Sequence, residues 1–450
     1  MASAHDRVVI ISTGDEIVVG QLLDTNSKFL AEKLVGVGVL PVEHVTVPDE
    51  LPAIVETLRR ACKEAPLVIM SGGLGPTDGD LTRHALAALL GEKLVLDAGA
   101  RAQLAGLLAR RGREMTARQE RQAFRPESAK CMANEFGTAP GLHAVVRSGA
   151  VHVNSDVFCL PGPPGELRPM FERQVLTVLR PLVGRVVVTR LLHVVGVPEA
   201  DCVDRLGDLT RRDRNPLVGV TASSGVLTVR IRYDGDLARE AAAALVDQAE
   251  AKVEQALGDH LFAKGEGPGV EMLARTLLGL LTAKGRTLSV VESCTGGMLG
   301  QMLTAIPGAS ASFVGGEITY SDGVKKVLGV SGATLEAHGA VSAETCREMA
   351  ERGLERFGSD YAIAITGIAG PDGGSERKPL GTTFVGVAGR GKGGEVGEAG
   401  GRETGDVRRF LFTGGREDVR RRACVTAMAM LYFSLRGRHP GGPKLLWQVG

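Results

Sequence analysis

A serine, a tyrosine and a lysine lie close together in the last third of the chain, at Ser310, Tyr320 and Lys325. A lysine amine that burial keeps neutral can act as a general base, and a serine hydroxyl that gives its proton to such a base can act as a nucleophile. Ser321 and Asp322 can begin a helix that would carry Lys325 after one turn. Spacing alone leaves two interpretations open: a set of catalytic groups, or a chance grouping in which the lysine is a solvated surface charge.

Two glycine-rich segments each follow a short apolar run, as in the turn between a strand and a helix. The first is Gly-Gly-Leu-Gly-Pro-Thr at residues 72–77, and the second is Glu-Ser-Cys-Thr-Gly-Gly at residues 292–297. Glycines let backbone N–H groups approach an anion, and a helix N-terminus adds positive potential. Glycines also occur in such turns simply because the chain must bend, so phosphate binding and a plain bend both remain open.

Acidic residues accompany the first of these segments. Asp15 follows the first apolar run, and Asp78 and Asp80 follow Thr77. Loops that follow parallel strands meet at one edge of the sheet, where carboxylates can hold a divalent metal that bridges phosphates. Helix capping is the alternative, and it explains Asp24 well but explains the pair of Asp78 and Asp80 less well.

Two further residues have both a chemical and an ordinary interpretation. Cys294 would stand at a helix N-terminus, which lowers the pKa of a thiol, but cysteine is more often a small buried residue, and we favour that role. Arg416 begins the last predicted helix and can bind a phosphate through two N–H groups. The alternative is a surface arginine, since three more arginines follow at residues 420–422.

The composition indicates a globular protein of two or three domains. The chain has 450 residues, 44% of them hydrophobic, and its 53 basic and 52 acidic side chains almost cancel. A net charge of +1 gives no general attraction to nucleic acid or to an anionic membrane, so we expect neither as a partner.

The seven cysteines form no Cys-X-X-Cys motif, which argues against zinc and disulfides and favours a cytoplasmic location. The N-terminus lacks the pattern of a signal peptide, and no apolar run approaches the length of a membrane span.

Short apolar runs alternate with helical segments in both terminal parts, which predicts α/β folds with mostly parallel sheets. The N-terminal part has expected strands at 8–12, 42–47 and 67–71 and expected helices at 27–35 and 51–62. The middle part has strand-like runs within 186–197 and 217–233 and expected helices at 199–209 and 237–257. It shows no catalytic grouping, and we expect a packing or dimerisation module there. The last part has expected strands at 287–291 and 361–365 and expected helices at 270–284 and 417–435.

Taken together, these motifs resemble those of the CinA family of competence/damage-inducible proteins. The N-terminal strings are Gly-Asp-Glu at 14–16, the segment 72–77, Gly-Thr-Ala-Pro-Gly at 137–141 and Leu-Pro-Gly at 160–162. The C-terminal strings are the segment 292–297, Thr-Tyr-Ser at 319–321 with Lys325, and Gly-Ile-Ala-Gly-Pro-Asp-Gly-Gly at 367–374. The first set resembles a MoaB/MogA-like molybdopterin-binding domain, and the second resembles a nicotinamide-nucleotide amidase domain.

The resemblance covers nearly the whole chain and implies three domains and an enzyme. The domains are a three-layer αβα MoaB/MogA-like domain at 1–180, a small α+β domain at 181–263 and an αβα amidase domain at 264–440. The amidase domain would hydrolyse nicotinamide mononucleotide to nicotinic acid mononucleotide and ammonia, without a cofactor. The family's catalytic positions fall on Ser310, Tyr320 and Lys325, and the substrate-binding positions fall on Ser293, Thr295, Gly296, Thr366 and Arg416.

For the N-terminal domain the resemblance implies cleavage of ADP-ribose to AMP and ribose 5-phosphate. Gly73, Gly75 and Thr77 would bind the substrate. Asp15, Asp78 and Asp80 would hold a divalent ion such as Mg²⁺, Co²⁺ or Mn²⁺, and potassium would assist.

One position departs from the family pattern. The family usually has two adjacent aspartates after Gly-Pro-Thr-X, whereas this chain reads Asp78-Gly79-Asp80. One alternative is therefore a domain that binds a pterin or a nucleotide without cleaving it. Another is a role as an interaction factor in competence or the damage response, and the resemblance also implies a homodimer.

Overall fold

The computed structural model describes residues 4–147, 154–182, 184–390, 402–437 and 444–449. The chain divides into two compact units. The first is Met1–Val188 with Asp234–Ala242, and the second is Thr189–Tyr233 with Ala243–Gly450. Within the described ranges, no helix has the length and apolar character that a membrane span requires.

The first unit is built on a six-stranded sheet with the strand order β2-β1-β3-β8-β7-β6. Its strands are β1 (Arg7–Thr13), β2 (Leu40–Val47), β3 (Leu67–Ser71), β6 (Lys130–Met132), β7 (Gly141–Arg147) and β8 (Asn154–Leu160). The strands from β2 to β8 in this order are parallel, and β7 and β6 complete the sheet in antiparallel pairs. The apolar runs of β1 and β3 are buried because helices cover both faces of the sheet.

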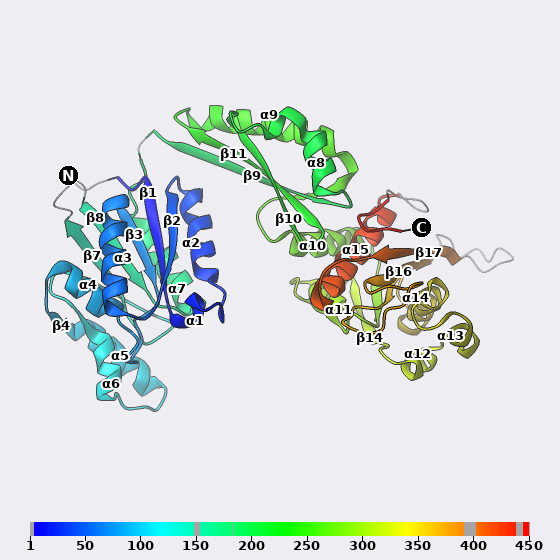
Figure 1. The fold of residues 1–450 in the computed structure, drawn as a ribbon, viewed down its shortest axis with the longest axis horizontal. Helices are drawn as coiled ribbons and strands as arrows, with labels where there is room; N and C mark the ends of the chain where they lie inside the picture. Colours follow the sequence, from blue (N-terminus) through cyan, green and yellow to red (C-terminus); the bar gives the residue numbers. More distant parts are fainter. Residues whose placement is uncertain (1–3, 148–153, 183, 391–401, 438–443, 450) are drawn as a thin grey trace. The chain divides into compact units, whose positions relative to one another are not determined.

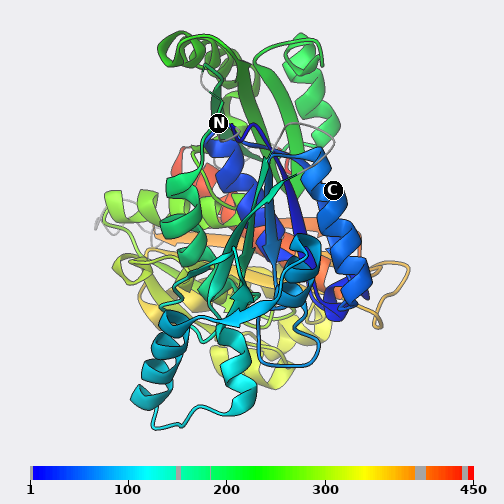
Figure 2. The same cartoon turned by 90° about the vertical axis from the view of Figure 1, so that its left-hand side faces the viewer.

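Two helices pack on each face of this sheet (Figure 1). Helices α2 (Thr25–Gly36) and α7 (Pro164–Met170) cover one face, and α3 (Leu51–Glu64) and α4 (Thr82–Leu90) cover the other. Helices α5 (Ala98–Arg110) and α6 (Ala117–Glu120), coloured cyan, lie beyond one end of the sheet in both views (Figures 1 and 2). The short helix α1 (Asp15–Val18) and the paired strands β4 (Leu94–Leu96) and β5 (Phe124–Pro126) complete the domain. The expected αβα architecture is confirmed.

The second unit begins with a four-stranded antiparallel sheet of order β10-β11-β9-β12. Its elements are β9 (Val186–Val195), α8 (Glu199–Leu206), β10 (Leu217–Ser223), β11 (Val226–Gly235), α9 (Arg239–Leu257) and β12 (Leu261–Lys264). This sequence of elements is the split βαβ arrangement, so the expected small α+β domain is confirmed.

The middle domain shares an apolar core with the C-terminal part. Val195, Val226 and Phe262 belong to the same buried cluster as residues of helices α10 (Gly269–Ala283) and α15 (Arg416–Leu435). The ring of Phe262 lies 6.3 Å from the ring of Tyr432. The glycine-rich segment 265–269 therefore joins two parts that pack against each other within one unit.

The C-terminal part contains a five-stranded sheet of order β14-β13-β15-β16-β17. The strands are β13 (Leu288–Glu292), β14 (Phe313–Ile318), β15 (Tyr361–Gly367), β16 (Thr382–Arg390) and β17 (Arg402–Leu411). Strands β14, β13 and β15 are parallel, and β16 and β17 are antiparallel additions.

Helices cover both faces of this second sheet as well. Helices α10, α11 (Met298–Thr304) and α15 pack on one face. Helices α12 (Asp322–Leu328), α13 (Gly332–His338) and α14 (Ala343–Phe357) pack on the other. Because β13, β14 and β15 run parallel, the loops that follow them meet at one edge of the sheet, where binding sites in such folds are usually found.

Candidate active site

The edge at the carboxyl ends of β13, β14 and β15 gathers most of the residues singled out from the C-terminal sequence. Ser293, Thr295 and Gly296 follow β13, and Tyr320 and Lys325 follow β14. Thr366 lies near the end of β15, and Arg416 begins α15. Hydrogen bonds link several of these residues directly, and they can therefore be considered as one site.

Glu292 organises the turn after β13. Its carboxyl oxygens accept hydrogen bonds from the backbone N–H groups of Gly297 (3.0 Å), Leu299 (3.1 Å) and Gly300 (2.8 Å). Gly296 and Gly297 have φ values of 60° and 92°, which favour glycine and let the chain fold around this carboxyl group. The N–H groups of Gly297, Leu299 and Gly300 are thus already bound by the chain in this conformation, and phosphate binding by this segment stays a prediction.

The amine of Lys325 is the central group of the site. Only 1% of the side chain is exposed, and Nζ lies 2.8 Å from Thr319 O, 3.2 Å from Tyr320 O and 3.2 Å from Ser293 Oγ. None of the ion pairs recorded for the described residues includes Lys325. Burial lowers the pKa of Lys325 below its usual value of 10.5, although nearby Asp322 acts in the opposite direction. The interpretation of Lys325 as a solvated surface charge is therefore wrong.

A cap positions this lysine. The side chain of Ser321 accepts a hydrogen bond from Val324 N (3.4 Å) and begins α12, as the sequence predicts. One turn later the helix directs Lys325 inward toward the end of β13.

Tyr320 and Arg416 form the exposed side of the site. The guanidinium of Arg416 donates to the Tyr320 hydroxyl (3.0 Å) and to the carbonyl of Gly370 (2.6 Å). Both side chains are solvent-exposed, and Arg416 retains further N–H groups that can bind an anion. Arg416 is thus a surface arginine, and at the same time a candidate binding group at this edge.

Two threonines lie beneath this exposed layer. The hydroxyl of Thr366 donates to Ala340 O (2.8 Å), and the side chain is fully buried. Thr295 is also buried, and its hydroxyl has no hydrogen-bond partner among the described residues, while its carbonyl accepts from Arg420 (2.8 Å). In this conformation both threonines are buried behind the exposed side chains of Tyr320 and Arg416, and neither side chain reaches solvent.

Ser310 lies at the other end of β14. It belongs to the 3₁₀ turn Ala309–Ala311, which precedes Phe313, whereas Tyr320 and Lys325 follow Ile318. The strand from Phe313 to Ile318 rises about 17 Å, at ~3.3 Å per residue. The expectation that Ser310 stands beside Lys325 in the same chain is therefore wrong, because β14 separates the two residues. The serine in contact with Lys325 is Ser293.

Cys294 behaves as the ordinary interpretation predicts. The side chain is buried, and burial raises the pKa of the Cys294 thiol to about 12. A thiol of this kind stays protonated near neutral pH, so it is a packing residue and not a nucleophile.

In the first unit, Asp80 plays the role that Glu292 plays in the second. Its carboxylate accepts from Gly75 N (2.7 Å), Thr77 N (2.7 Å) and the Thr77 hydroxyl (2.5 Å). A Cβ added to Gly75 would lie 2.6 Å from an Asp80 oxygen, so only glycine allows this approach. Gly75 and Thr77 therefore bind Asp80 in this structure, and Gly73 packs against Thr82.

The three aspartates proposed as metal ligands do not come together. Asp78 is exposed and pairs with Arg121 at 2.9 Å. Asp15 accepts a hydrogen bond from Asp49 N (3.1 Å), and Asp80 holds its own turn. Across the described residues, no group of three or more His, Cys, Asp or Glu side chains could hold a metal ion. In this conformation each of Asp15, Asp78 and Asp80 has a different local partner, and their role as metal ligands stays a prediction.

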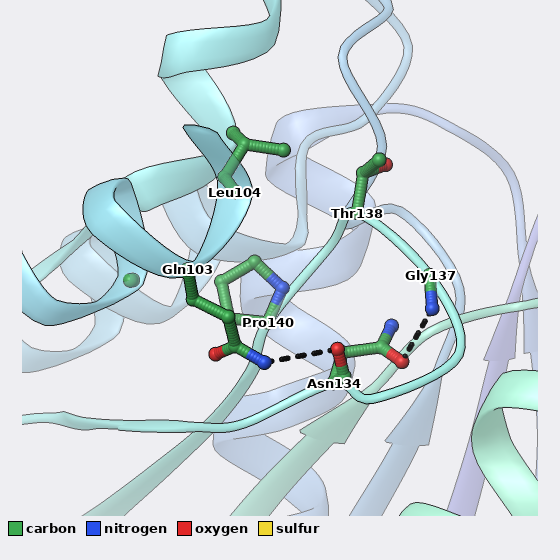
Figure 3. A pocket seen from close by; sticks show the side chains of 7 residues that line it. Gln103, Leu104, Asn134, Gly137, Thr138 and Pro140 are labelled. Carbon is green, nitrogen blue, oxygen red and sulfur yellow. Dashed lines mark hydrogen bonds between the residues drawn. The ribbon is translucent and has the colours of Figure 1, made fainter. Parts of the chain in front are cut away.

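A small pocket of the first unit lies between α5 and the segment 134–140 (Figure 3). Asn134 accepts from Gly137 N (2.9 Å), and its carbonyl accepts from Gln103 (3.0 Å). The pocket has a cavity volume of only about 10 Å³, whereas ligand sites typically measure roughly 300–1,000 Å³. We therefore regard it as a packing feature of the segment 137–141.

The sequence analysis missed Glu292 as a positioning residue. A glutamate that ends a buried strand and precedes Gly-Gly is the signal that identifies it, since a buried carboxyl group needs several donors. Glu292 fixes the turn that carries Ser293, because its carboxyl group binds three backbone N–H groups of that turn.

These observations define a multidomain α/β protein in which a βαββαβ module links two αβα domains, one of which carries a buried lysine at its sheet edge. Three family models match the chain: "Probable molybdopterin binding domain" at 9–181, "Damage-inducible protein CinA KH domain" at 189–263 and "CinA C-terminal domain" at 270–435.

Two relatives, each matched over nearly its whole length, support the same assignment. A putative competence-damage inducible protein of Moorella thermoacetica is 39% identical over 431 residues, which are 95% of this chain and 98% of that protein. One of Symbiobacterium thermophilum is 40% identical over 438 residues, with 95% and 98% covered. A solved structure of competence/damage inducible protein CihA from Agrobacterium tumefaciens is 36% identical and covers 38% of this chain and 99% of its own, with a TM-score of 0.33. The chain belongs to the CinA family.

The KH match adds a point about the middle domain that the sequence analysis lacked. KH domains clamp a nucleic-acid backbone with a Gly-X-X-Gly loop. Residues 189–263 contain no Gly-X-X-Gly sequence. The expectation that this protein does not bind nucleic acid directly stays a prediction, and the missing loop is consistent with it.

Proposed function

We propose that the C-terminal domain is an amidohydrolase that converts nicotinamide mononucleotide to nicotinic acid mononucleotide and ammonia, with Lys325 as its general base. The observation that carries this proposal is the buried amine of Lys325. Among the described residues, its hydrogen-bond partners are the oxygens of two carbonyls and one hydroxyl. Burial without a paired carboxylate favours the neutral amine, and only the neutral amine can accept a proton.

The three contacts of Lys325 also suggest where the lone pair lies. A neutral amine keeps two N–H groups, which match the carbonyls of Thr319 (2.8 Å) and Tyr320 (3.2 Å). The lone pair is then left for the third neighbour, the hydroxyl of Ser293 at 3.2 Å. Ser293 can thus position the base or relay a proton to it.

The proposed reaction needs no redox partner and no cofactor. A serine hydroxyl attacks the carboxamide carbon, and its proton moves to Lys325 as the new C–O bond forms. The C–N bond then breaks, and the leaving ammonia takes the proton from Lys325. Water attacks the resulting ester in the same way, which releases the carboxylic acid and restores the serine and the neutral amine.

The exposed side of the site suits a substrate that carries a phosphate. Arg416 provides a guanidinium beside Tyr320, and a guanidinium can bind a phosphate with two parallel hydrogen bonds. The choice of nicotinamide mononucleotide as the substrate rests on family resemblance. The Lys325 amine would accept the proton, and the Arg416 guanidinium would bind the phosphate.

Ammonia release from nicotinamide mononucleotide by the full chain tests this function. We expect steady ammonia release with matching formation of nicotinic acid mononucleotide, and much slower release from nicotinamide riboside, which lacks the phosphate. No ammonia from the mononucleotide would refute the proposal. Equal rates on both substrates would refute the phosphate-binding role of Arg416.

For the N-terminal domain we infer that it binds a nucleotide or pterin without cleaving it. The observation that favours this alternative is the separation of Asp15, Asp78 and Asp80, each of which has a different partner. Incubation with ADP-ribose and Mg²⁺, Co²⁺ or Mn²⁺ should release no AMP, while calorimetry with ADP-ribose should still detect binding. Metal-dependent release of AMP would overturn this inference.

The names of the relatives suggest a third function, as an interaction factor in competence or damage response. Partners recovered from a pull-down, together with no hydrolysis by either domain, would favour that function over the two above.

A further inference from the structure

A second arginine of helix α15, Arg420, contacts the turn that carries Ser293. The guanidinium of Arg420 donates a hydrogen bond to the carbonyl of Thr295 (2.8 Å), and it pairs with Glu417 on its own helix at 3.0 Å. A hydrogen bond from a charged donor is stronger than one between neutral groups, and only 26% of the Arg420 side chain is exposed to competing water. Arg420 is therefore a firm contact between the helix and the turn after β13.

The turn from Ser293 to Gly296 is anchored at its first residue and closed by its own backbone. Ser293 N donates to Ile365 O in the neighbouring strand β15 (3.0 Å), and Gly296 N donates to Ser293 O (3.1 Å). Thr295 is the third residue of this turn, so the carbonyl that Arg420 holds lies past the anchored end. Arg420 thus adds a restraint where the strand contact of Ser293 does not reach.

The same turn carries a buried polar group that needs such a restraint. The Thr295 hydroxyl is fully buried and has no hydrogen-bond partner among the described residues. An unpaired buried hydroxyl costs free energy, and a turn that keeps one must be held in place by other contacts. The hydrogen bond from Arg420 to Thr295 O is one contact that offsets this cost.

Arg420 and Arg416 connect one helix to both sides of the site. They are four residues apart on α15, so their side chains lie on the same face of the helix, one turn apart. Arg416 donates to the Tyr320 hydroxyl and to Gly370 O, in the segments after β14 and β15. Arg420 donates to the turn after β13. Helix α15 therefore joins the proposed phosphate-binding group to the turn that carries Ser293.

We propose that Arg420 is a positioning residue, which sets the Ser293 hydroxyl against the Lys325 amine by holding the carbonyl of Thr295. This inference rests on the proposed amidohydrolase function. Ser293 Oγ lies 3.2 Å from Lys325 Nζ, at the long end of the range for such a hydrogen bond, so a small movement of the turn separates the two atoms. A misplacement of about 1 Å in a catalytic arrangement can lower the rate about a hundredfold.

The steady-state kinetics of ammonia release from nicotinamide mononucleotide test this role. Arg420→Met removes the guanidinium, and we expect kcat to fall by about tenfold to a hundredfold while KM changes by less than about twofold. Arg416→Met is the comparison, and loss of its phosphate contact should raise KM by about tenfold or more. An unchanged kcat for Arg420→Met would overturn the inference. A rise in KM like that of Arg416→Met would also overturn it, because Arg420 would then bind the substrate.

Arg421→Met is the matched control for the loss of one positive charge. Arg421 is exposed and pairs with the same Glu417 at 3.4 Å, so this variant removes an arginine from the same helix without touching the turn. Both kcat and KM should stay within about twofold of the wild-type values. An equal fall of kcat in Arg421→Met would show that charge, and not the contact with Thr295, lowers the rate, and would overturn the inference.

Arg420→Lys tests whether the contact itself restores the rate. Lysine keeps the positive charge and a donor, so kcat should lie between those of Arg420→Met and the wild type, with KM unchanged. No recovery relative to Arg420→Met would overturn the inference. If Arg420→Met does not fold, Arg420→Lys carries the test, and wild-type kinetic constants for it would overturn the inference. No ammonia from the wild-type protein would instead refute the proposed function.

Discussion

The turn after β3 and the turn after β13 look alike in sequence and in local structure. Each follows a buried strand, and each uses glycines at positive φ, with 102° and 66° at Gly72 and Gly73 and 60° and 92° at Gly296 and Gly297. In each turn a carboxyl group of the chain itself accepts the free N–H groups, Asp80 in the first and Glu292 in the second.

The two turns differ in what lies beside them. The neighbours of Asp80 are partly exposed, and Asp78, two residues away, is paired with a surface arginine. The turn at Glu292 is buried, and Lys325 from the next strand connection adds an uncompensated amine. A glycine-rich turn therefore does not make a reactive site by itself. The second turn becomes a candidate active site because an adjacent segment buries a base against it.

The largest effect should come from removing that base. Lys325→Met keeps much of the side-chain volume but removes the amine, and we expect ammonia release to fall by about a hundredfold or more, as for loss of a general base. Lys326→Met is the matched control, because Lys326 is exposed and should tolerate the change. Steady-state rates of ammonia release by both variants test this. A near-normal rate for Lys325→Met would mean that the amine is not the base, and the turn after β13 would then have no advantage over the turn after β3.

The pH dependence should be the next largest effect. Because burial lowers the pKa of Lys325, the rate should rise about tenfold per pH unit up to an inflection below 10.5, where the amine is neutral. The unfolded chain binds more protons than the folded chain between the lowered pKa and 10.5, so stability should also rise with pH across that window. Lys325→Met should lack this rise in stability, and an inflection at or above 10.5 would contradict the burial argument.

Removing the carboxyl group of each turn, Glu292 or Asp80, should lower the free energy of unfolding by different amounts. Glu292→Ala leaves three backbone N–H groups without an acceptor in a buried turn, and we expect a loss of about 3 kcal/mol in the free energy of unfolding. Asp80→Ala affects a partly exposed turn, where water can replace the carboxylate, and should cost about 1 kcal/mol.

The single tryptophan allows these losses to be measured separately. Trp447 belongs to the second unit, so its fluorescence reports on that unit during denaturation. Glu292→Ala should shift the fluorescence transition, and Asp80→Ala should shift only a transition seen by circular dichroism. An equal loss in the free energy of unfolding for Glu292→Ala and Asp80→Ala would mean that burial does not make the second turn more dependent on its carboxyl group.

Replacing Gly79, where the family usually has an aspartate, tests what the turn after β3 lacks. A Cβ at Gly79 would lie 3.8 Å from an Asp49 oxygen, with room for a side chain, and φ at Gly79 is not positive. Gly79→Asp should therefore place a second carboxylate near Asp49 and give detectable Mn²⁺ binding by calorimetry, unlike the parent chain. Gly106→Asp is the control for added charge, because Gly106 lies on α5 without a positive φ and an added Cβ there meets nothing within 4 Å. An unchanged Gly79→Asp protein would mean that the missing aspartate is not what limits the first turn.

The smallest effect should be that of Cys294→Ala. The thiol is buried and protonated, so the rate of ammonia release should change by less than about twofold. A large loss of activity without a loss of stability would restore the thiol as a nucleophile.

Much of the architecture follows from local sequence. Val8 to Ile11 and Leu67 to Met70 form buried strands because each run is apolar throughout, and Asp24 caps α2 because its carboxylate reaches Ser27 N at 2.9 Å. The helix that carries Lys325 begins at Ser321 for the same reason. Such features depend on a few neighbouring residues, and the sequence therefore determines them.

The composition of the site depended on tertiary structure. The sequence placed Ser310 near Lys325 because they are fifteen positions apart, but β14 carries them to opposite ends of the sheet. Asp15, Asp78 and Asp80 looked like one cluster, but each carboxylate found a different partner. The physical reason is the same in both cases: residue types and spacing fix local conformation, whereas strand direction and register decide which ends of the chain meet.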